Sequence, residues 1–129
     1  MKELKDFSLD SFEDLVHGNG AKENVIADAE KELELTFCHE YKQYLLKYGL
    51  AMVNGHELSG ISNNKRTNVV DLTKKYNDGN EIYKNKYVIE DTNIDGITIW
   101  QDVEGIIYLA KNNKVETIAN SLISYIEHY

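Results

Sequence analysis

The chain has 129 residues and a formal net charge of −8, from 14 basic and 22 acidic side chains. This length fits one domain, and a chain so acidic is repelled by phosphate backbones, which argues against direct nucleic-acid binding. Its one cysteine cannot form an internal disulfide, and its first residues lack the apolar run of a signal peptide. We therefore expect a single cytoplasmic domain over residues 1–129, with no membrane contact.

The first half of the chain predicts helices. A short helix is expected over 11–17, because the Gly-Asn-Gly run at 18–20 stops an apolar pattern. A second helix is expected over 21–35, where apolar residues recur at helical spacing. A third is expected over 38–48, with Gly49 just past its end. The last two together predict an αα-hairpin with a short joint.

The second half predicts mainly strands. Residues 56–61 favour an edge strand and 63–66 a polar loop. Residues 67–79 favour a helix capped by Thr67, although Val69 and Val70 also suit a strand. Segments rich in β-branched and aromatic residues then predict strands at 86–90, 96–100, 105–110 and 115–118. Residues 101–104 and the Asn112-Asn113 pair are expected to form the turns between them, and 118–129 a closing helix. The predicted fold class is α+β, an antiparallel sheet packed by the N-terminal helices and the C-terminal helix.

The pair Cys38-His39 is the first candidate for chemistry. A thiolate nucleophile needs a base within hydrogen-bond reach, yet neighbours on a helix point about 100° apart. We therefore expect Cys38 to pack as a small apolar residue at a helix start. The four histidines, at 17, 39, 56 and 128, lack the spacing of a metal pair on a helix. The sequence predicts no catalytic residue, no metal site and no cofactor. A small hydrolase that uses scattered carboxylates or Cys38 stays an alternative.

The segment from Asp91 to Asp102 resembles a calcium-binding loop in its spacing of Asp and Asn. Against that interpretation, Asp102 stands where a bidentate Glu is expected, and the flanks favour strands where an EF-hand needs helices. The alternative is an Asx-rich turn between strands. The sequence favours the turn, and cation binding by this segment stays open.

Trp100 is the candidate anchor of a partner-binding surface. It alternates with Ile97 and Ile99 on the predicted strand, so it points away from their face. It then faces solvent or a partner, or it is covered by another element. Acidic residues crowd the two ends of that strand, and an aromatic with an acidic rim suits a basic partner. The candidate partner-binding residues are Glu57, Asp91, Asp95, Trp100, Asp102 and Glu104.

One set of residues from the two predicted helices and the segment after them forms a recognisable pattern: Ala29-Glu30, Leu33, Tyr41-Lys42, Tyr44-Leu45, Tyr48-Gly49 and Glu57-Leu58-Ser59-Gly60. Through this pattern the chain from Ile26 to Tyr129 resembles the SUKH (Smi/Knr-like) superfamily. One departure is Cys38, which stands where members of the family usually carry proline. The resemblance implies an α+β domain with an antiparallel sheet, and its bacterial members are mostly immunity proteins for secreted polymorphic toxins.

The resemblance therefore implies an immunity protein that neutralises a cognate toxin by binding it, without catalysis. The acidic charge fits a basic toxin domain, a nuclease, of a neighbouring secreted protein. The alternative is a non-catalytic interaction or regulatory module of the same fold. We expect a monomer or a weak homodimer, and a dimer through exposed sheet edges stays open.

Overall fold

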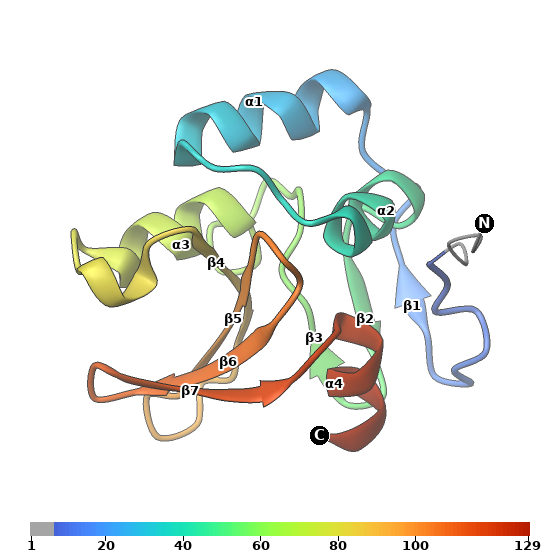
Figure 1. Ribbon diagram of the computed structural model, residues 1–129. Helices are drawn as coiled ribbons and strands as arrows, with labels where there is room; N and C mark the ends of the chain where they lie inside the picture. Colours follow the sequence, from blue (N-terminus) through green and yellow to red (C-terminus); the bar gives the residue numbers. More distant parts are fainter. Residues whose placement is uncertain (1–6) are drawn as a thin grey trace, which may run out of the picture.

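The computed structural model describes residues 7–129, which form helices and two antiparallel sheets (Figure 1). In chain order the elements are β1 (Val16–His17), α1 (Glu23–Leu33), α2 (His39–Lys47), β2 (Ala51–Val53), β3 (His56–Glu57), α3 (Val69–Asn77), the 3-10 helix η1 (Glu81–Tyr83), β4 (Lys86–Asp91), β5 (Thr98–Asp102), β6 (Ile107–Lys111), β7 (Lys114–Ala119) and α4 (Leu122–His128). The predicted α+β class is confirmed. Across residues 7–129, every helix falls short of the length and apolar character that a bilayer span requires.

The larger sheet has the order β4-β5-β6-β7, with every neighbouring pair antiparallel. It contains the strands expected in the last third of the chain. Asn112 and Asn113 both have positive φ, at 53° and 61°, as the predicted tight turn requires. The final helix begins at Leu122, later than predicted, because Ile118 and Ala119 belong to β7.

Helices α1 and α2 form the expected pair, and a carboxylate holds their joint. Glu34 ends α1 in the left-handed conformation, and Cys38 caps α2 with its sulfur accepting from the Tyr41 N–H. The Glu30 carboxylate accepts from the Phe37 N–H at 2.8 Å and pairs with Lys42 at 3.3 Å. Glu30 therefore connects the end of α1 to the start of α2.

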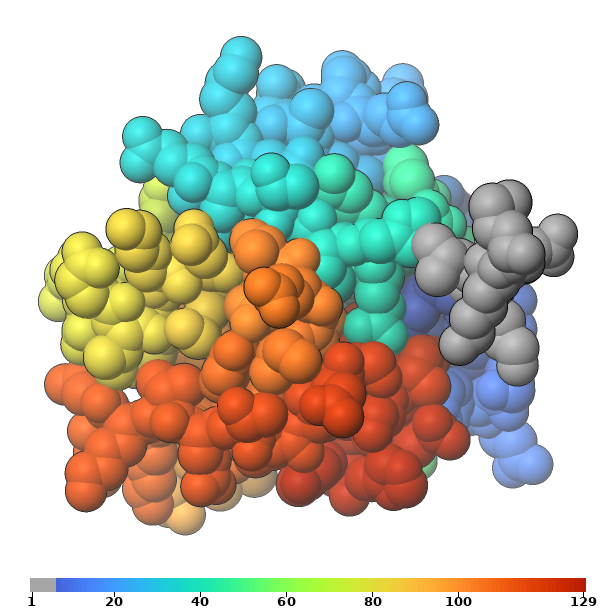
Figure 2. Space-filling model, viewed as in Figure 1, coloured from blue at the N-terminus to red at the C-terminus, as the bar shows by residue number. Residues whose placement is uncertain are grey.

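Both faces of the larger sheet are covered. Ile99 of β5 belongs to the main core, which also contains the tyrosines of α2 and Leu122 and Ile126 of α4. Trp100, the next residue, belongs to a second cluster with Leu72 of α3. The space-filling view shows the chain from β6 to α4 over the lower part of one side of the molecule, below α1 and α2 (Figure 2).

The predicted helix over 11–17 is wrong. Residues 10–14 form turns, and Val16 and His17 pair with Met52 and Ala51 of β2 in a small sheet of order β1-β2-β3. Phe12 and Leu15 still pack against the core, so the apolar pattern was real. A short helix has few hydrogen bonds to offset its nucleation cost, and here pairing with β2 satisfies the backbone of Val16 and His17 instead.

Helix α3 starts one residue later than predicted. Its cap is Asn68, whose side-chain oxygen accepts from the Val70 and Asp71 N–H groups at 2.9 and 3.2 Å. Thr67 instead hydrogen-bonds Ser62 across the preceding loop, with 2.9 Å between the hydroxyl oxygens. An Asn side chain caps a helix as well as Thr does, so the local sequence offered two equivalent choices.

Candidate partner-binding surface

Cys38 is a packed residue of the core. Its side chain is buried, and burial raises the pKa of the thiol above its usual value. Its sulfur accepts a hydrogen bond from the Tyr41 backbone N–H at 3.4 Å, while its neighbour His39 is exposed. A protonated, buried thiol is a poor nucleophile, so this pair does not form a reactive site.

Trp100 is fully buried, so the prediction that it anchors a partner is wrong. Its ring stacks on Tyr83 of η1 with 4.2 Å between ring centroids, and its indole N–H donates to Thr98 Oγ1 at 2.8 Å. The alternative interpretation, cover by another element, is correct. The alternation along β5 placed the side chain on the right face, and the chain from α3 to η1 lies over that face.

Two of the candidate acidic residues organise local structure. Asp102 accepts from the Glu104 and Ile106 N–H groups through Oδ1 and from the Tyr108 hydroxyl through Oδ2. Asp91 accepts from the Tyr76 hydroxyl at 2.6 Å and from the Asn93 N–H at 3.1 Å. The hydrogen bond from Tyr76 to Asp91 is the largest cause that raises the pKa of this tyrosine to about 12. Burial, and then Asp102, raise the pKa of Tyr108 to about 12 as well.

The segment after Asp91 has the geometry of a turn. Asn93, Asp95 and Gly96 all have positive φ, and the Thr92 hydroxyl donates to the Ile97 carbonyl at 2.7 Å. The Ile97 carbonyl and both Asp91 carboxylate oxygens, which a cation bound by this segment would use, therefore already accept hydrogen bonds. Within residues 7–129, no three His, Cys, Asp or Glu side chains gather as metal ligands. The flanking elements are strands, which favours the Asx-rich turn.

The candidate acidic residues do not form one cluster. Asp91 is paired with Thr98 at one end of β5, and Asp102 lies at the other end. Four residue steps along a strand separate those ends by about 13 Å. Asp95 and Glu104 are exposed at opposite ends in the same way. Asp102 and Glu104 lie together at one end, and folding brings Glu57, which is distant in sequence, to the same cleft as Asp91.

That cleft, here called the charged cleft, has a volume of about 920 Å³. Its lining residues are mostly polar and carry both signs of charge: Glu57, Asn64, Lys65, Arg66, Asp71, Leu72, Lys74, Lys75, Asp91 and Asn93. The rim is therefore less acidic than the sequence predicted. Lining of this kind suits charge pairing with a protein surface better than it suits enclosure of an apolar ligand.

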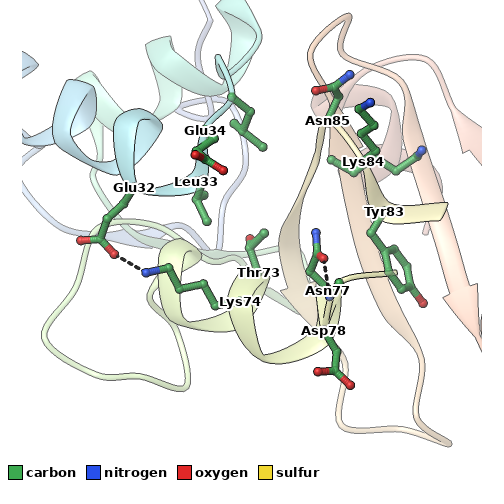
Figure 3. Close-up of a pocket in the computed structure, with 13 residues that line it drawn as sticks. Glu32, Leu33, Glu34, Thr73, Lys74, Asn77, Asp78, Tyr83, Lys84 and Asn85 are labelled. Atoms are coloured by element: carbon green, nitrogen blue, oxygen red, sulfur yellow. Dashed lines mark hydrogen bonds and ion pairs between the residues drawn. The ribbon is translucent and has the colours of Figure 1, made fainter. Parts of the chain in front are cut away.

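A second groove of about 460 Å³ lies between the end of α1 and the segment from α3 to β4. Figure 3 shows Glu32 of α1 and Lys74 of α3 pointing toward one another, and the Lys74 ammonium lies 2.7 Å from the Glu32 carboxylate. Lys84 and Asn85 project from the opposite wall (Figure 3). Lys74 also lines the charged cleft, so the two hollows adjoin.

Two carboxylates, the half-buried Glu40 and the buried Glu90, have structural roles that sequence reasoning missed. Glu40 of α2 accepts from the backbone N–H groups of Leu122 and Ile123, at 2.6 and 3.2 Å, and from Gln101 Nε2 at 3.0 Å. Burial raises the pKa of this carboxyl, and those hydrogen bonds partly offset the effect. Glu40 is separated from its backbone partners by more than 80 residues, so no local pattern could have revealed the contact.

Glu90 of β4 forms the other buried network. Its Oε1 lies 2.8 Å from His56 Nδ1 and accepts from the Tyr125 hydroxyl at 2.5 Å. These bonds join β3, β4 and α4. The network reaches the Glu57 backbone, whose N–H donates to Glu90 Oε2 at 3.3 Å. It therefore holds the strand that carries Glu57 at the border of the charged cleft.

The arrangement defines a small α+β domain with open, charged surface hollows and a tyrosine-rich core. The SUKH_5 family model, described as SMI1-KNR4 cell-wall, matches residues 2–129. The chain therefore belongs to this SUKH family, and the resemblance drawn from its sequence is confirmed. A search of curated proteins gave no match.

Proposed function

We propose that this protein is a cytoplasmic immunity protein that binds and neutralises the toxin domain of a cognate secreted polymorphic toxin. The observation that carries the proposal is the family match over nearly the whole chain. Membership of the SUKH superfamily is consistent with an immunity protein. The protein acts by occupying the toxin surface, and it carries out no reaction of its own.

The proposed target is a basic nuclease domain. Such a domain carries positive charge for its substrate, and a chain of net charge −8 attracts it over a distance. The proposed contacts are exposed carboxylates, Glu57, Asp95 and Glu104, with the half-buried Asp91 and Asp102 beside them. Because they lie at the two ends of β5, these carboxylates contact separate parts of the phosphate-binding groove of the toxin and so exclude its substrate. Trp100 supports the sheet from within and makes no contact.

The proposal is tested by calorimetric titration of the purified protein with the toxin domain encoded beside it. The variant Glu57→Lys/Asp95→Lys/Glu104→Lys is compared with a control, Asp28→Lys/Glu116→Lys/Glu127→Lys. All six positions are exposed, and both variants change the net charge equally.

Loss of long-range attraction lowers the affinity of both variants for the toxin domain equally, and this effect is smaller at high salt, which screens the attraction. Loss of direct contacts lowers the affinity of the first variant alone. We expect the first variant to bind the toxin domain about a hundredfold more weakly than the control variant does. Equal affinities for the two variants would reject these contacts, and no binding by the unaltered protein would reject the proposed function.

The second candidate is a non-catalytic interaction or regulatory module of the same fold. The family description favours it in one respect, because it names the cell wall. The two candidates differ in their partner. A complex with the adjacent toxin domain supports immunity, whereas its absence supports the regulatory module.

A further inference from the structure

The outer face of the small sheet carries an exposed apolar pair beside a carboxylate. Val16 of β1 and Met52 of β2 are Cα partners, and Met52 is in turn paired with Glu57 of β3. Directly paired residues project from the same face of a sheet. Val16 is 66% exposed and Met52 is 52% exposed. Adjoining apolar side chains left in water mark interaction surfaces.

A hollow of about 490 Å³ lies beside Met52. Its apolar side comes from Leu50, Ala51 and Met52, and its polar side comes from the loop over residues 62–67. Among the described residues that line it, Glu57 is the only one with a charged side chain. The hollow therefore combines aliphatic surface with a single negative charge.

Hydrogen bonds hold both sides of the hollow in place. In the loop, Asn68 Nδ2 donates to the Ser62 carbonyl at 2.8 Å, and the hydroxyl oxygens of Ser62 and Thr67 lie 2.9 Å apart. On β3, the Glu57 N–H donates to Glu90 Oε2 at 3.3 Å, which connects this strand to the buried network of Glu90. The hollow is therefore preformed, and binding requires little further ordering of this protein.

The carboxylate of Glu57 is available to a cation. Glu57 is exposed, and it makes no ion pair within residues 7–129. It also lines the charged cleft, but Lys65 and Arg66 line that cleft and not the hollow. A group that enters the hollow therefore meets a negative charge next to aliphatic side chains.

We propose that this hollow binds an arginine side chain of the toxin domain, with the guanidinium at Glu57 and the aliphatic stem against Leu50 and Met52. An arginine stem packs along apolar surface while its charged head stays at a polar edge. A guanidinium binds a carboxylate through two parallel hydrogen bonds and is more weakly hydrated than an ammonium, so arginine matches the hollow better than lysine does. This inference rests on the proposed function, because a basic nuclease domain presents such side chains to phosphate.

The lining of the hollow selects against other occupants. A wholly apolar side chain would cover the Glu57 carboxylate without pairing it, which costs free energy. An acidic side chain would meet that carboxylate with like charge.

A titration without any toxin tests what the hollow binds. N-acetyl-arginine amide is added at millimolar concentrations to the full, isotope-labelled chain, and backbone amide shifts are recorded by NMR. N-acetyl-citrulline amide is the control probe, because it has nearly the same shape and no charge, and the ionic strength is matched with salt. We expect the arginine probe alone to shift the amides of Met52, Glu57 and Asn63, and Glu57→Gln to abolish these shifts. No shift, or equal shifts with both probes, would overturn the inference.

The toxin domain then tests whether the bound arginine belongs to this partner. In calorimetric titrations, Met52→Ala and Glu57→Gln each raise the dissociation constant about tenfold. The double variant raises it by less than the product of the two, because both side chains contact the same arginine. The control variant, Ile94→Ala/Glu116→Gln, changes two exposed positions outside the hollow and keeps the affinity of the unaltered protein.

The outcomes separate this inference from the proposed function. If the unaltered protein binds the toxin domain but the single variants bind equally well, or their effects multiply in full, the inference is overturned and the proposed function stands. If the unaltered protein does not bind the toxin domain, the proposed function is rejected together with this toxin contact, and the arginine titration still decides what the hollow binds.

Discussion

Replacement of Glu40 by alanine is expected to loosen α4 from the rest of the molecule. The first turn of α4 presents N–H groups that have no acceptor within the helix. Ser121 Oγ accepts from the Ser124 N–H at 3.0 Å, and Glu40 accepts from Leu122 and Ile123. Alanine leaves those two donors and Gln101 Nε2 without the carboxylate.

The magnitude follows from the number of bonds. Each hydrogen bond to a charged acceptor contributes about 1.5 kcal/mol, and removal of the carboxylate also removes its own cost of burial. We expect Glu40→Ala to lower the free energy of unfolding by about 3 kcal/mol. Urea denaturation measures the total, and amide hydrogen exchange should increase first at Tyr125 and Tyr129, whose N–H groups bond within α4.

Glu116→Ala on β7 is the control, because Glu116 is exposed and surface changes of this kind shift stability by less than about 0.5 kcal/mol. A loss below about 1 kcal/mol for Glu40→Ala, or faster exchange spread evenly over the chain, would refute the view that this carboxylate holds α4 in place.

Three further predictions concern groups that the fold shields from solvent. Because burial raises the pKa of Glu40, the folded state binds the carboxyl proton more tightly than the unfolded state does. The free energy of unfolding of the unaltered protein, relative to that of Glu40→Gln, should therefore fall as pH rises from the unfolded-state pKa toward the folded-state pKa. A difference that does not change with pH would contradict this prediction. The Cys38 thiol should react with a disulfide reagent at neutral pH only after denaturant is added, and rapid reaction in the native state would contradict its burial. Trp100 fluorescence should be blue-shifted and protected from iodide in the native protein, and a quenched, red-shifted emission would place the indole in solvent.

The local elements were the most predictable part of this fold. Strands β4 to β7 follow from β-branched segments separated by turns, and the Asn112-Asn113 pair supplies the positive φ that its turn needs. Helices α1 and α2 follow from apolar residues at helical spacing. The segment 11–17 was not predictable in this way, since its few apolar residues serve a turn and a short strand as well as a helix.

Contacts between distant segments account for the remaining differences. Alternation along β5 placed Trp100 opposite Ile99, but only the path of the chain through α3 and η1 decides what covers it. The same limit applied to the acidic residues. The sequence placed Asp91 and Asp102 at the two ends of one strand, as the structure does, but it could not show that folding brings Glu57 beside Asp91. A surface patch depends on tertiary structure, which local periodicity does not encode.

The most direct test of the central claim is co-expression of the tagged protein with the toxin domain encoded beside it. Growth and co-purification are measured together, with an empty vector as the control. The proposal predicts a stable complex. It also predicts that cells producing both proteins grow, whereas cells producing the toxin domain alone do not. Continued toxicity with no complex, from a chain shown to be folded, would contradict the immunity function and favour the regulatory module.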